Sequence, residues 1–258
     1  MIILDLRARA LSPEGPVPEL VRLPDGERTL VVSTWRQRML NEHLSARVFE
    51  ALEHQARAVG LDGEPLEMLG GFPEEERTHA RRCAGLLASW GVDAVVEHSV
   101  PPSVPEHAET GPRAAFLRNL LSVCCLSETV AVAQITAERE RLEPGGIRAT
   151  LTTILSDEIG HARLGWRILE REELLGDEER RDLNAYLPTA FAALEAHQLE
   201  HVSPLPAPGE AARFGACDGV QTRELFYDTV EHVIVPRLEH HGLNAKAAWT
   251  ERRTAAAV

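Results

Sequence analysis

The sequence contains few cysteines, and their spacing excludes several kinds of site. The four are Cys83, Cys124, Cys125 and Cys217, and none belongs to a Cys-x-x-Cys pair. Zinc ribbons and rubredoxin-type iron sites need such pairs, so the sequence predicts neither. Nothing in this spacing suggests a disulfide framework, which favours a reducing cytoplasm as the compartment.

Basic residues are also scarce. Lys246 is the only lysine, and 40 acidic residues against 27 basic ones give a formal net charge of −13. Nonspecific nucleic-acid binding needs a basic surface, so we expect no nucleic-acid partner. The 258 residues, 44% of them hydrophobic, are enough for a sizeable core.

A signal peptide and a membrane span are not expected. Ile2, Ile3 and Leu4 are followed at once by Asp5 and Arg7, which leaves no apolar signal-peptide core. No apolar run reaches the length that a membrane-spanning helix needs. We therefore expect a cytoplasmic protein without a membrane partner.

Apolar residues recur at helical spacing through most of the chain and predict an all-α fold. Ser33 is a good N-cap for a first helix over 34–59, in which Leu40 and Leu44 share a face. Further helices are expected over 73–90, 112–143, 147–175, 177–202 and 224–241, the last kinked at Pro236.

The segments between these helices suggest a division of the chain into three parts. Residues 1–32 are expected to form an irregular arm, residues 33–176 a four-helix bundle, and residues 177–258 a helical extension packed on the bundle and ending in a polar tail. Residues 2–4 and 29–32 are expected to form short strands or extended arms, and residues 60–72 a glycine-rich loop, with Pro73 in the first turn of the next helix. The proline-rich stretch 92–112 predicts a long crossover between the second and third helices.

Two Glu-x-x-His pairs are the clearest chemical signal in the chain. They are Glu76 with His79 and Glu158 with His161. Residues i and i+3 lie on one face of an α-helix, so a carboxylate and an imidazole at this spacing can bind one metal ion from the same side.

Each pair is preceded by a glutamate within an apolar helix. Glu42 lies 34 residues before Glu76, and Glu128 lies 30 residues before Glu158, which indicates a repeat of two helical hairpins. Burying an ionised carboxylate costs several kcal/mol of free energy unless the group is paired or binds a metal. Carboxylates with imidazoles suit iron or manganese, and zinc is a further alternative. We therefore expect a centre of two iron ions, with manganese or a mixed pair as alternatives, bound by Glu42, Glu76, His79, Glu128, Glu158 and His161.

Two points about this set stay open in the sequence. Glu50 and Glu53 lie on the same predicted helix as Glu42, and Glu42 is preferred because its distance to Glu76 best matches the second repeat. Cys124 and Cys125 precede Glu128 by one turn. We interpret them as small core residues, with a cavity wall or redox relay as the alternative.

The predicted helices and their ligand pattern resemble the ferritin-like di-iron carboxylate superfamily over roughly residues 34–175. The local pattern from Glu76 to Arg82 is similar to that of rubrerythrins, although the chain lacks their cysteine-ligated electron-transfer domain. The resemblance implies that the glutamates of the two pairs bridge the ions and that the other two bind one ion each. It also implies that Asp157 holds His79, and Glu75 holds His161, through the second ring nitrogen.

The resemblance further implies an oxidoreductase. We expect a non-haem di-iron oxidase or oxygenase that uses dioxygen or peroxide, a small-molecule substrate and an external electron donor, and that forms a homodimer. One alternative is a ferroxidase or a rubrerythrin-like peroxide scavenger without an organic substrate. The other is a non-catalytic helical module that binds metal for stability.

Overall fold

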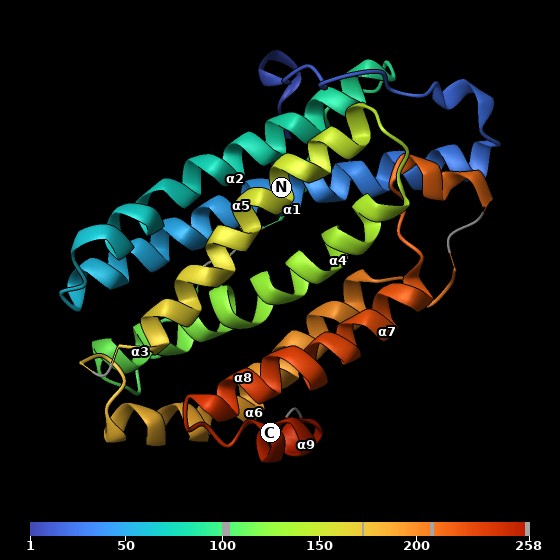
Figure 1. Cartoon of the computed structure of the whole chain (residues 1–258). Coiled ribbons are helices and arrows are strands. Elements are labelled where there is room, and N and C mark those ends of the chain that lie inside the picture. Colours follow the sequence, from blue (N-terminus) through green and yellow to red (C-terminus); the bar gives the residue numbers. More distant parts are fainter. Residues whose placement is uncertain (100–103, 172, 207–208, 256–258) are drawn as a thin grey trace.

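The structure is a computed structural model and describes residues 1–99, 104–171, 173–206 and 209–255 (Figure 1). Across these residues the fold is all-α apart from two short strands. Helices α1 (Asp25–Ala58) and α2 (Gly63–Ser89) form a tightly packed hairpin, and α5 (Gly146–Leu169) lies against α2.

The second long helical stretch completes the central group of helices. It consists of α3 (Pro112–Leu120), a π-helical segment (Leu121–Ser127) and α4 (Glu128–Arg141), which follow one another without a break. Helix α3 contacts α1, and α4 contacts α5. The four lengths of helix therefore enclose a common interior (Figure 1).

The C-terminal helices gather on the side of α3 and α4 (Figure 1). They are α6 (Asp177–His201), α7 (Gly219–Thr229), a π-helical segment (Val230–Ile234), α8 (Val235–His240) and α9 (Ala245–Ala255). Helix α6 contacts α3 and α9, and α7 contacts α4. The sequence predicted a polar tail after Gly242, and this was wrong, because α9 buries Ala248 and Trp249 against the other C-terminal helices.

The buried apolar residues fall into two clusters at opposite ends of the central helices. One cluster takes the first part of α1 up to Leu40, the later part of α2 from Ala80, and α5 up to Leu155. The other takes α1 from Phe49, α2 up to Phe72, and the later part of α5, with the C-terminal helices. The layer between them is where the six predicted ligands lie.

The N-terminal arm runs from residue 1 to Pro24. The predicted strand at 2–4 is present as β1 (Ile2–Asp5), which pairs antiparallel with β2 (Val95–His98) from the predicted crossover. The strand predicted at 29–32 is wrong, because α1 begins at Asp25 and includes those residues. The arm then passes so close to α2 that a Cβ on Gly85 would stand 1.6 Å from the Leu11 carbonyl oxygen.

The loop predicted at 60–72 is also wrong. Helix α2 begins at Gly63, so Pro73 lies inside the helix and not in its first turn. Local propensity disfavours these glycines and the proline, but packing outweighs it here. Phe72 and Pro73 are buried, and Gly70 lets the Glu53 side chain approach to 3.1 Å from where a Cβ would stand.

One stretch of the chain has the length and composition of a membrane span. Within Pro112–Arg141 an 18-residue window has a mean hydropathy of 1.6, and 44% of that window is buried. This corrects the expectation that no apolar run is long enough. The same stretch carries the buried Glu128 and packs against α1, α5 and α6.

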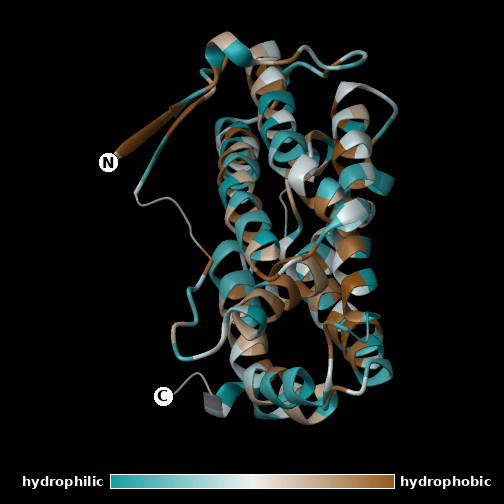
Figure 2. Cartoon of the chain, turned by 90° about the vertical axis from the view of Figure 1, so that its left-hand side faces the viewer, coloured by the Kyte–Doolittle hydropathy of each residue, from teal (hydrophilic) through white to brown (hydrophobic). Residues whose placement is uncertain are grey.

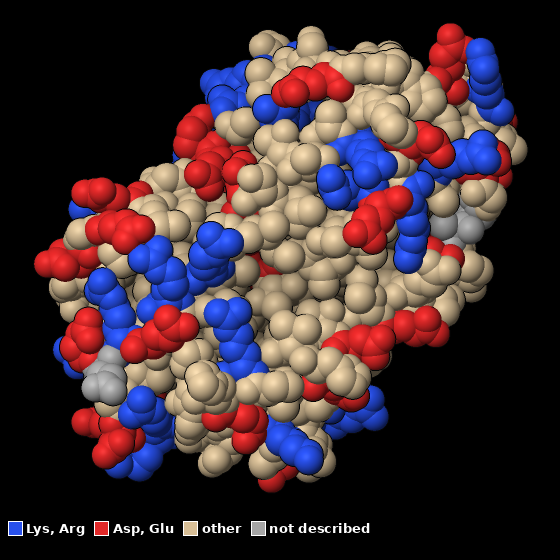
Figure 3. All heavy atoms as spheres, viewed as in Figure 1, with Lys and Arg blue, Asp and Glu red and all other residues tan. Residues whose placement is uncertain are grey.

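The surface mixes charges of both signs. In the side view of Figure 2, apolar and polar residues alternate along the helices, and the N-terminal strand stands away from the helical body. On the face shown in Figure 3, acidic and basic side chains alternate around a largely uncharged centre. The acidic excess on this face is therefore spread out and does not form one patch.

Candidate metal centre

The structure brings all six predicted ligands together in the layer between the two apolar clusters. They form two overlapping groups, in each of which one ligand atom per residue lies within 4.8 Å of the others. We name these groups the first position and the second position. The first consists of Glu42, Glu76, His79 and Glu158, and the second of Glu76, Glu128, Glu158 and His161.

Helical register explains how the layer forms. Glu76 and His79 are one turn apart on α2, as are Glu158 and His161 on α5, so each pair points to one side. Glu76 and Glu158 belong to both positions, which is the sharing expected of bridging carboxylates. All six residues are at most 9% exposed, so the layer is closed to bulk water.

Both imidazoles turn the same nitrogen towards the shared carboxylates. His161 Nδ1 lies 3.0 Å from Glu158 Oε2 and 3.3 Å from Glu76 Oε1. His79 Nδ1 lies 3.4 Å from Glu42 Oε2 and 3.6 Å from Glu158 Oε1. The two histidines therefore present equivalent ligand atoms from opposite sides of the layer.

The other ring nitrogen of each histidine meets an outer carboxylate. His79 Nε2 lies 3.0 Å from Asp157 Oδ2, and His161 Nε2 lies 2.9 Å from Glu75 Oε2. Both contacts cross between α2 and α5. They fix the ring orientation and leave Nδ1 free to face the layer, which is how outer carboxylates prepare metal-binding histidines.

Two buried ligand atoms in the layer lack a hydrogen-bond partner among the described residues. They are Glu76 Oε2 and His79 Nδ1. Buried polar atoms are nearly always satisfied, so an unsatisfied pair in one place calls for a missing partner. Carboxylate oxygens and imidazole nitrogens bind divalent iron, manganese or zinc, and a cation would satisfy both atoms. The donor set thus fits a metal centre.

Without a cation, protons offset the negative charge of the four acids. Burial by itself lowers the pKa of His161, but side-chain contacts with Glu158, Glu75 and Glu76 raise it to about 12. Burial raises the pKa of Glu128 well above its ordinary value, and the charge of Glu158 adds to this. A divalent cation would take over this balancing role and displace the protons.

Glu42 differs from Glu128 in its pKa. Burial alone would raise the pKa of Glu42, but His79 and the guanidinium of Arg38 lower it below the ordinary carboxyl value. The two positions are thus alike in their ligands and unlike in their surroundings.

Aromatic rings close the layer on the side of His161. The Phe72 and Phe49 rings lie 4.1 Å and 4.9 Å from the His161 ring, centroid to centroid. The sequence gives no signal that Phe72 borders the site, because it lies in the stretch predicted to be a loop. Their side chains exclude water from the second position.

The alternative glutamates of α1 lie outside the layer. Glu50 pairs with Arg77 and is half exposed, and Glu53 accepts a hydrogen bond of 2.6 Å from Arg57. Cys124 and Cys125 are fully buried and pack against Gly165 of α5. The π-helical segment that ends at Ser127, immediately before Glu128, was missed, because its residues have an ordinary helical pattern. Such segments are frequent at functional sites.

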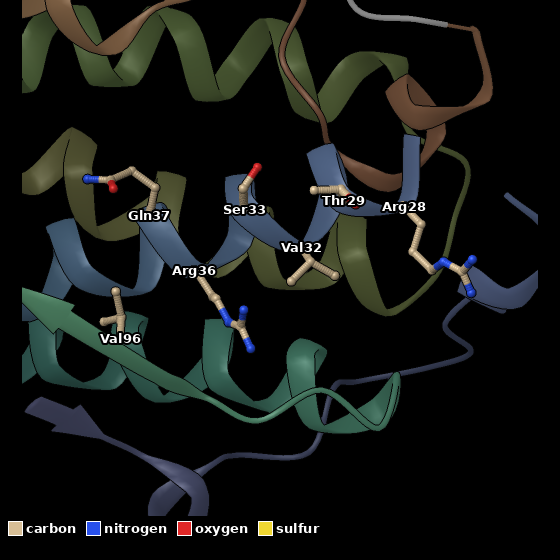
Figure 4. A pocket seen from close by; sticks show the side chains of 7 residues that line it. All are labelled: Arg28, Thr29, Val32, Ser33, Arg36, Gln37 and Val96. Atoms are coloured by element: carbon tan, nitrogen blue, oxygen red, sulfur yellow. The ribbon is translucent and has the colours of Figure 1, made fainter. Parts of the chain in front are cut away.

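A separate groove of about 510 Å³ lies on the outer side of α1 (Figure 4). It is lined by Arg28, Thr29, Val32, Ser33, Arg36, Gln37 and Val96. None of the six ligands contributes to it. Its polar side chains also have partners already, since Arg36 donates to the Asp93 carbonyl and Ser33 to the Leu30 carbonyl.

Comparisons with known proteins add no name to this geometry. No protein-family model matches the chain, and neither a curated protein nor a solved structure does. What this chain does is therefore inferred from the geometry of the site alone.

Proposed function

We propose that this chain is a di-iron carboxylate oxidoreductase that uses dioxygen to oxidise or oxygenate a small organic substrate. The observation that carries the proposal is the pair of overlapping four-ligand groups that share Glu76 and Glu158. Shared carboxylates keep two cations close together, as two-metal chemistry requires. Manganese, or one ion of each metal, would fit the same donor set.

The arrangement of α1, α2, α3–α4 and α5 supports a ferritin-like four-helix bundle as the finer fold. Two helices would each give one glutamate and the other two a Glu-x-x-His pair, which is the ligand pattern of that group of bundles. The stretch after α2 would be the crossover between the two hairpins, and α6 to α9 would be additions to the bundle.

The chain's own residues would have distinct tasks in this function. Glu42 and Glu128 would each bind one ion, Glu76 and Glu158 would bridge them, and the histidines would complete the two positions. A bound pair of iron ions would supply the electrons that activate dioxygen. Asp157 and Glu75 would hold the histidine rings, while Phe49 and Phe72 would keep water out.

Anaerobic loading with Fe²⁺ followed by exposure to oxygen tests this proposal. The metal-free chain should bind two Fe²⁺ per molecule, take up oxygen when air is admitted, and develop a new absorption band of ferric iron. Glu158→Ala should bind less than two ions because a shared ligand of both positions is lost. Glu50→Ala, on an exposed residue of α1, is the matched control and should behave as the unsubstituted chain.

Measuring zinc binding and peroxide consumption beside iron loading separates the alternatives. Failure to bind two ions would remove the metal centre from the proposal. Tight binding of redox-silent zinc with no oxygen uptake after iron loading would favour a structural metal module. Hydrogen peroxide consumed faster than dioxygen would favour a peroxide scavenger. Each of the last two outcomes would overturn the oxygenase proposal while leaving the ligand set intact.

A further inference from the structure

The two metal positions have different neighbours one turn away along the helices. Four residues before Glu42 on α1 stands Arg38, whereas four residues before Glu128 stands Cys124. Four residues after His79 stands Cys83, whereas four residues after His161 stands Gly165. The pseudo-symmetry of the ligands therefore ends at the next turn.

Arg38 is part of a partly buried polar cluster that joins three segments of the chain. Its Nη2 donates to Glu138 Oε2 of α4 at 2.5 Å, and the two side chains are only 13% and 11% exposed. The Cys217 thiol, from the segment before α7, donates to the other Glu138 oxygen at 2.6 Å. We name Arg38, Glu138 and Cys217 the polar flank of the first position.

Arg38 stands one turn before Glu42 on the same face of α1. Burial raises the pKa of the Cys83 thiol, the charge of Glu42 adds to this, and Arg38 lowers it. Burial and the charge of Glu138 raise the pKa of the Cys217 thiol, and Arg38 lowers it. Arg38 therefore brings a positive charge beside the first position while Glu138 holds its guanidinium.

The second position has no arginine three or four residues from any of its four ligands along the helices. Gly165 lets α5 approach the π-helical segment Leu121–Ser127 so closely that a Cβ added at Gly165 would stand 2.5 Å from Cys124 Cβ. Cys124 and Cys125 are fully buried there. This flank is tightly packed. The charge of Arg237 on α8, whose guanidinium lies 4.5 Å from the Trp166 ring centroid, reaches it and partly offsets the rise that burial gives to the pKa of the Cys125 thiol.

We propose that Arg38 is a positioning residue that makes the two metal positions unequal. Its charge repels a divalent cation at the first position, and the polar flank holds it there, so the first position binds its cation more weakly than the second. Arg38 Nε is buried and has no hydrogen-bond partner among the described residues. This inference rests on the proposed metal binding.

Titration of the metal-free chain with Co²⁺ at neutral pH, in two single-position backgrounds, tests the inference. His161→Ala keeps the first position, and His79→Ala keeps the second. The double replacement of Arg38→Met and Glu138→Gln should tighten Co²⁺ binding about tenfold in the His161→Ala background. The reason is that it removes the Coulomb repulsion between the Arg38 guanidinium and the cation in a buried site. The same double replacement should change affinity less than about twofold in the His79→Ala background.

Two controls separate charge from loss of packing. Arg38→Lys keeps a cation beside Glu138 and should keep the weak binding of the first position. Arg118→Met with Asp182→Asn removes another well-buried ion pair, between α3 and α6, and should leave both affinities unchanged. A merely structural role for Arg38 would lower both affinities and the melting temperature together.

A second measurement uses both histidines intact. The unsubstituted chain should bind Co²⁺ in two resolved steps, and the double replacement should bring the weaker step towards the stronger. Two equal Co²⁺ affinities in the unsubstituted chain, or an unchanged ratio of the two affinities after the replacement, would overturn the role given to Arg38. Neither result would contradict the proposed metal centre. A chain that binds no Co²⁺ at all would instead overturn the proposed metal centre.

Discussion

At the scale of single residues, the candidate centre depends on side chains that do not themselves face the shared layer. Asp157 lies 3.0 Å from His79 Nε2, and Glu75 lies 2.9 Å from His161 Nε2. Both carboxylates are partly exposed, whereas the histidines are fully buried. The outer pair therefore connects a closed layer to the protein surface.

Asp157→Ala should weaken metal binding without removing a ligand. Loss of the carboxylate frees the His79 ring to rotate and lowers its basicity, so we expect affinity for Fe²⁺ or Co²⁺ to fall about 10- to 100-fold. Ser156→Ala, at the exposed neighbouring residue of α5, should leave affinity unchanged. Equilibrium metal titration of the two variants provides the measurement, and equal affinities would contradict the role given to Asp157.

At the scale of the elements, α5 packs closely against the π-helical segment Leu121–Ser127 that precedes Glu128. Gly165 is buried where α5 crosses the π-helical segment, and a Cβ there would stand 2.9 Å from Cys125 Sγ. Gly160, on the same helix, has open space around it. Gly165 and Gly160 therefore differ, since a side chain at Gly165 would clash with the π-helical segment and one at Gly160 would meet nothing.

Gly165→Ala and Gly160→Ala should change stability in opposite directions. Overpacking at Gly165 should lower the free energy of unfolding by about 1–3 kcal/mol. At Gly160 the better helix propensity of alanine should raise it by up to about 1 kcal/mol. Urea unfolding of the metal-free variants measures both. A neutral effect of Gly165→Ala would mean that α5 can shift away from Cys124.

At the scale of the whole molecule, a buried ion pair joins α9, the last helix, to α6. Arg252 of α9 donates to both carboxylate oxygens of Glu195 on α6, at 2.9 Å and 3.0 Å, and both side chains are at most 10% exposed. Tyr227 of α7 donates to the same carboxylate at 2.9 Å. Three C-terminal helices therefore meet at one buried charge.

Arg252→Met should destabilise the chain by about 3–5 kcal/mol, because it leaves the Glu195 carboxylate buried without its partner. Arg253→Met is the control. Its side chain is 74% exposed and lies 3.4 Å from the same carboxylate, so its loss should cost about 1 kcal/mol or less. Chemical unfolding at neutral pH compares the two.

The effect of Arg252→Met should also depend on pH. Burial raises the pKa of Glu195, but Arg252 and Tyr227 lower it more, so the folded pKa lies below the ordinary carboxyl value. The stability from this group is therefore present above the ordinary value and is lost as the pH falls through the folded value. Unfolding in acid should show a smaller difference between Arg252→Met and the unsubstituted chain. An unchanged difference would contradict the ion-pair explanation.

The sequence by itself determined the all-α class, most of the helices and the six side chains predicted as metal ligands. Helical periodicity and the i, i+3 spacing of Glu76 with His79 and Glu158 with His161 are local properties, so they can be seen without the fold. The sequence misplaced the start of α2 and missed α9. The first turns of α2 are stabilised by packing that outweighs local propensity. Helix α9 is stabilised because one of its faces is buried against the other C-terminal helices, which cannot be seen from its own sequence.

Only the tertiary structure decided what surrounds those six residues. Arg38 and Glu138 are 100 residues apart in the chain, and nothing local indicates that they meet. The approach of Gly165 to Cys124 and the docking of Arg252 on Glu195 are of the same kind. Such contacts depend on which helix faces pack together, which is set by the burial of many apolar residues at once.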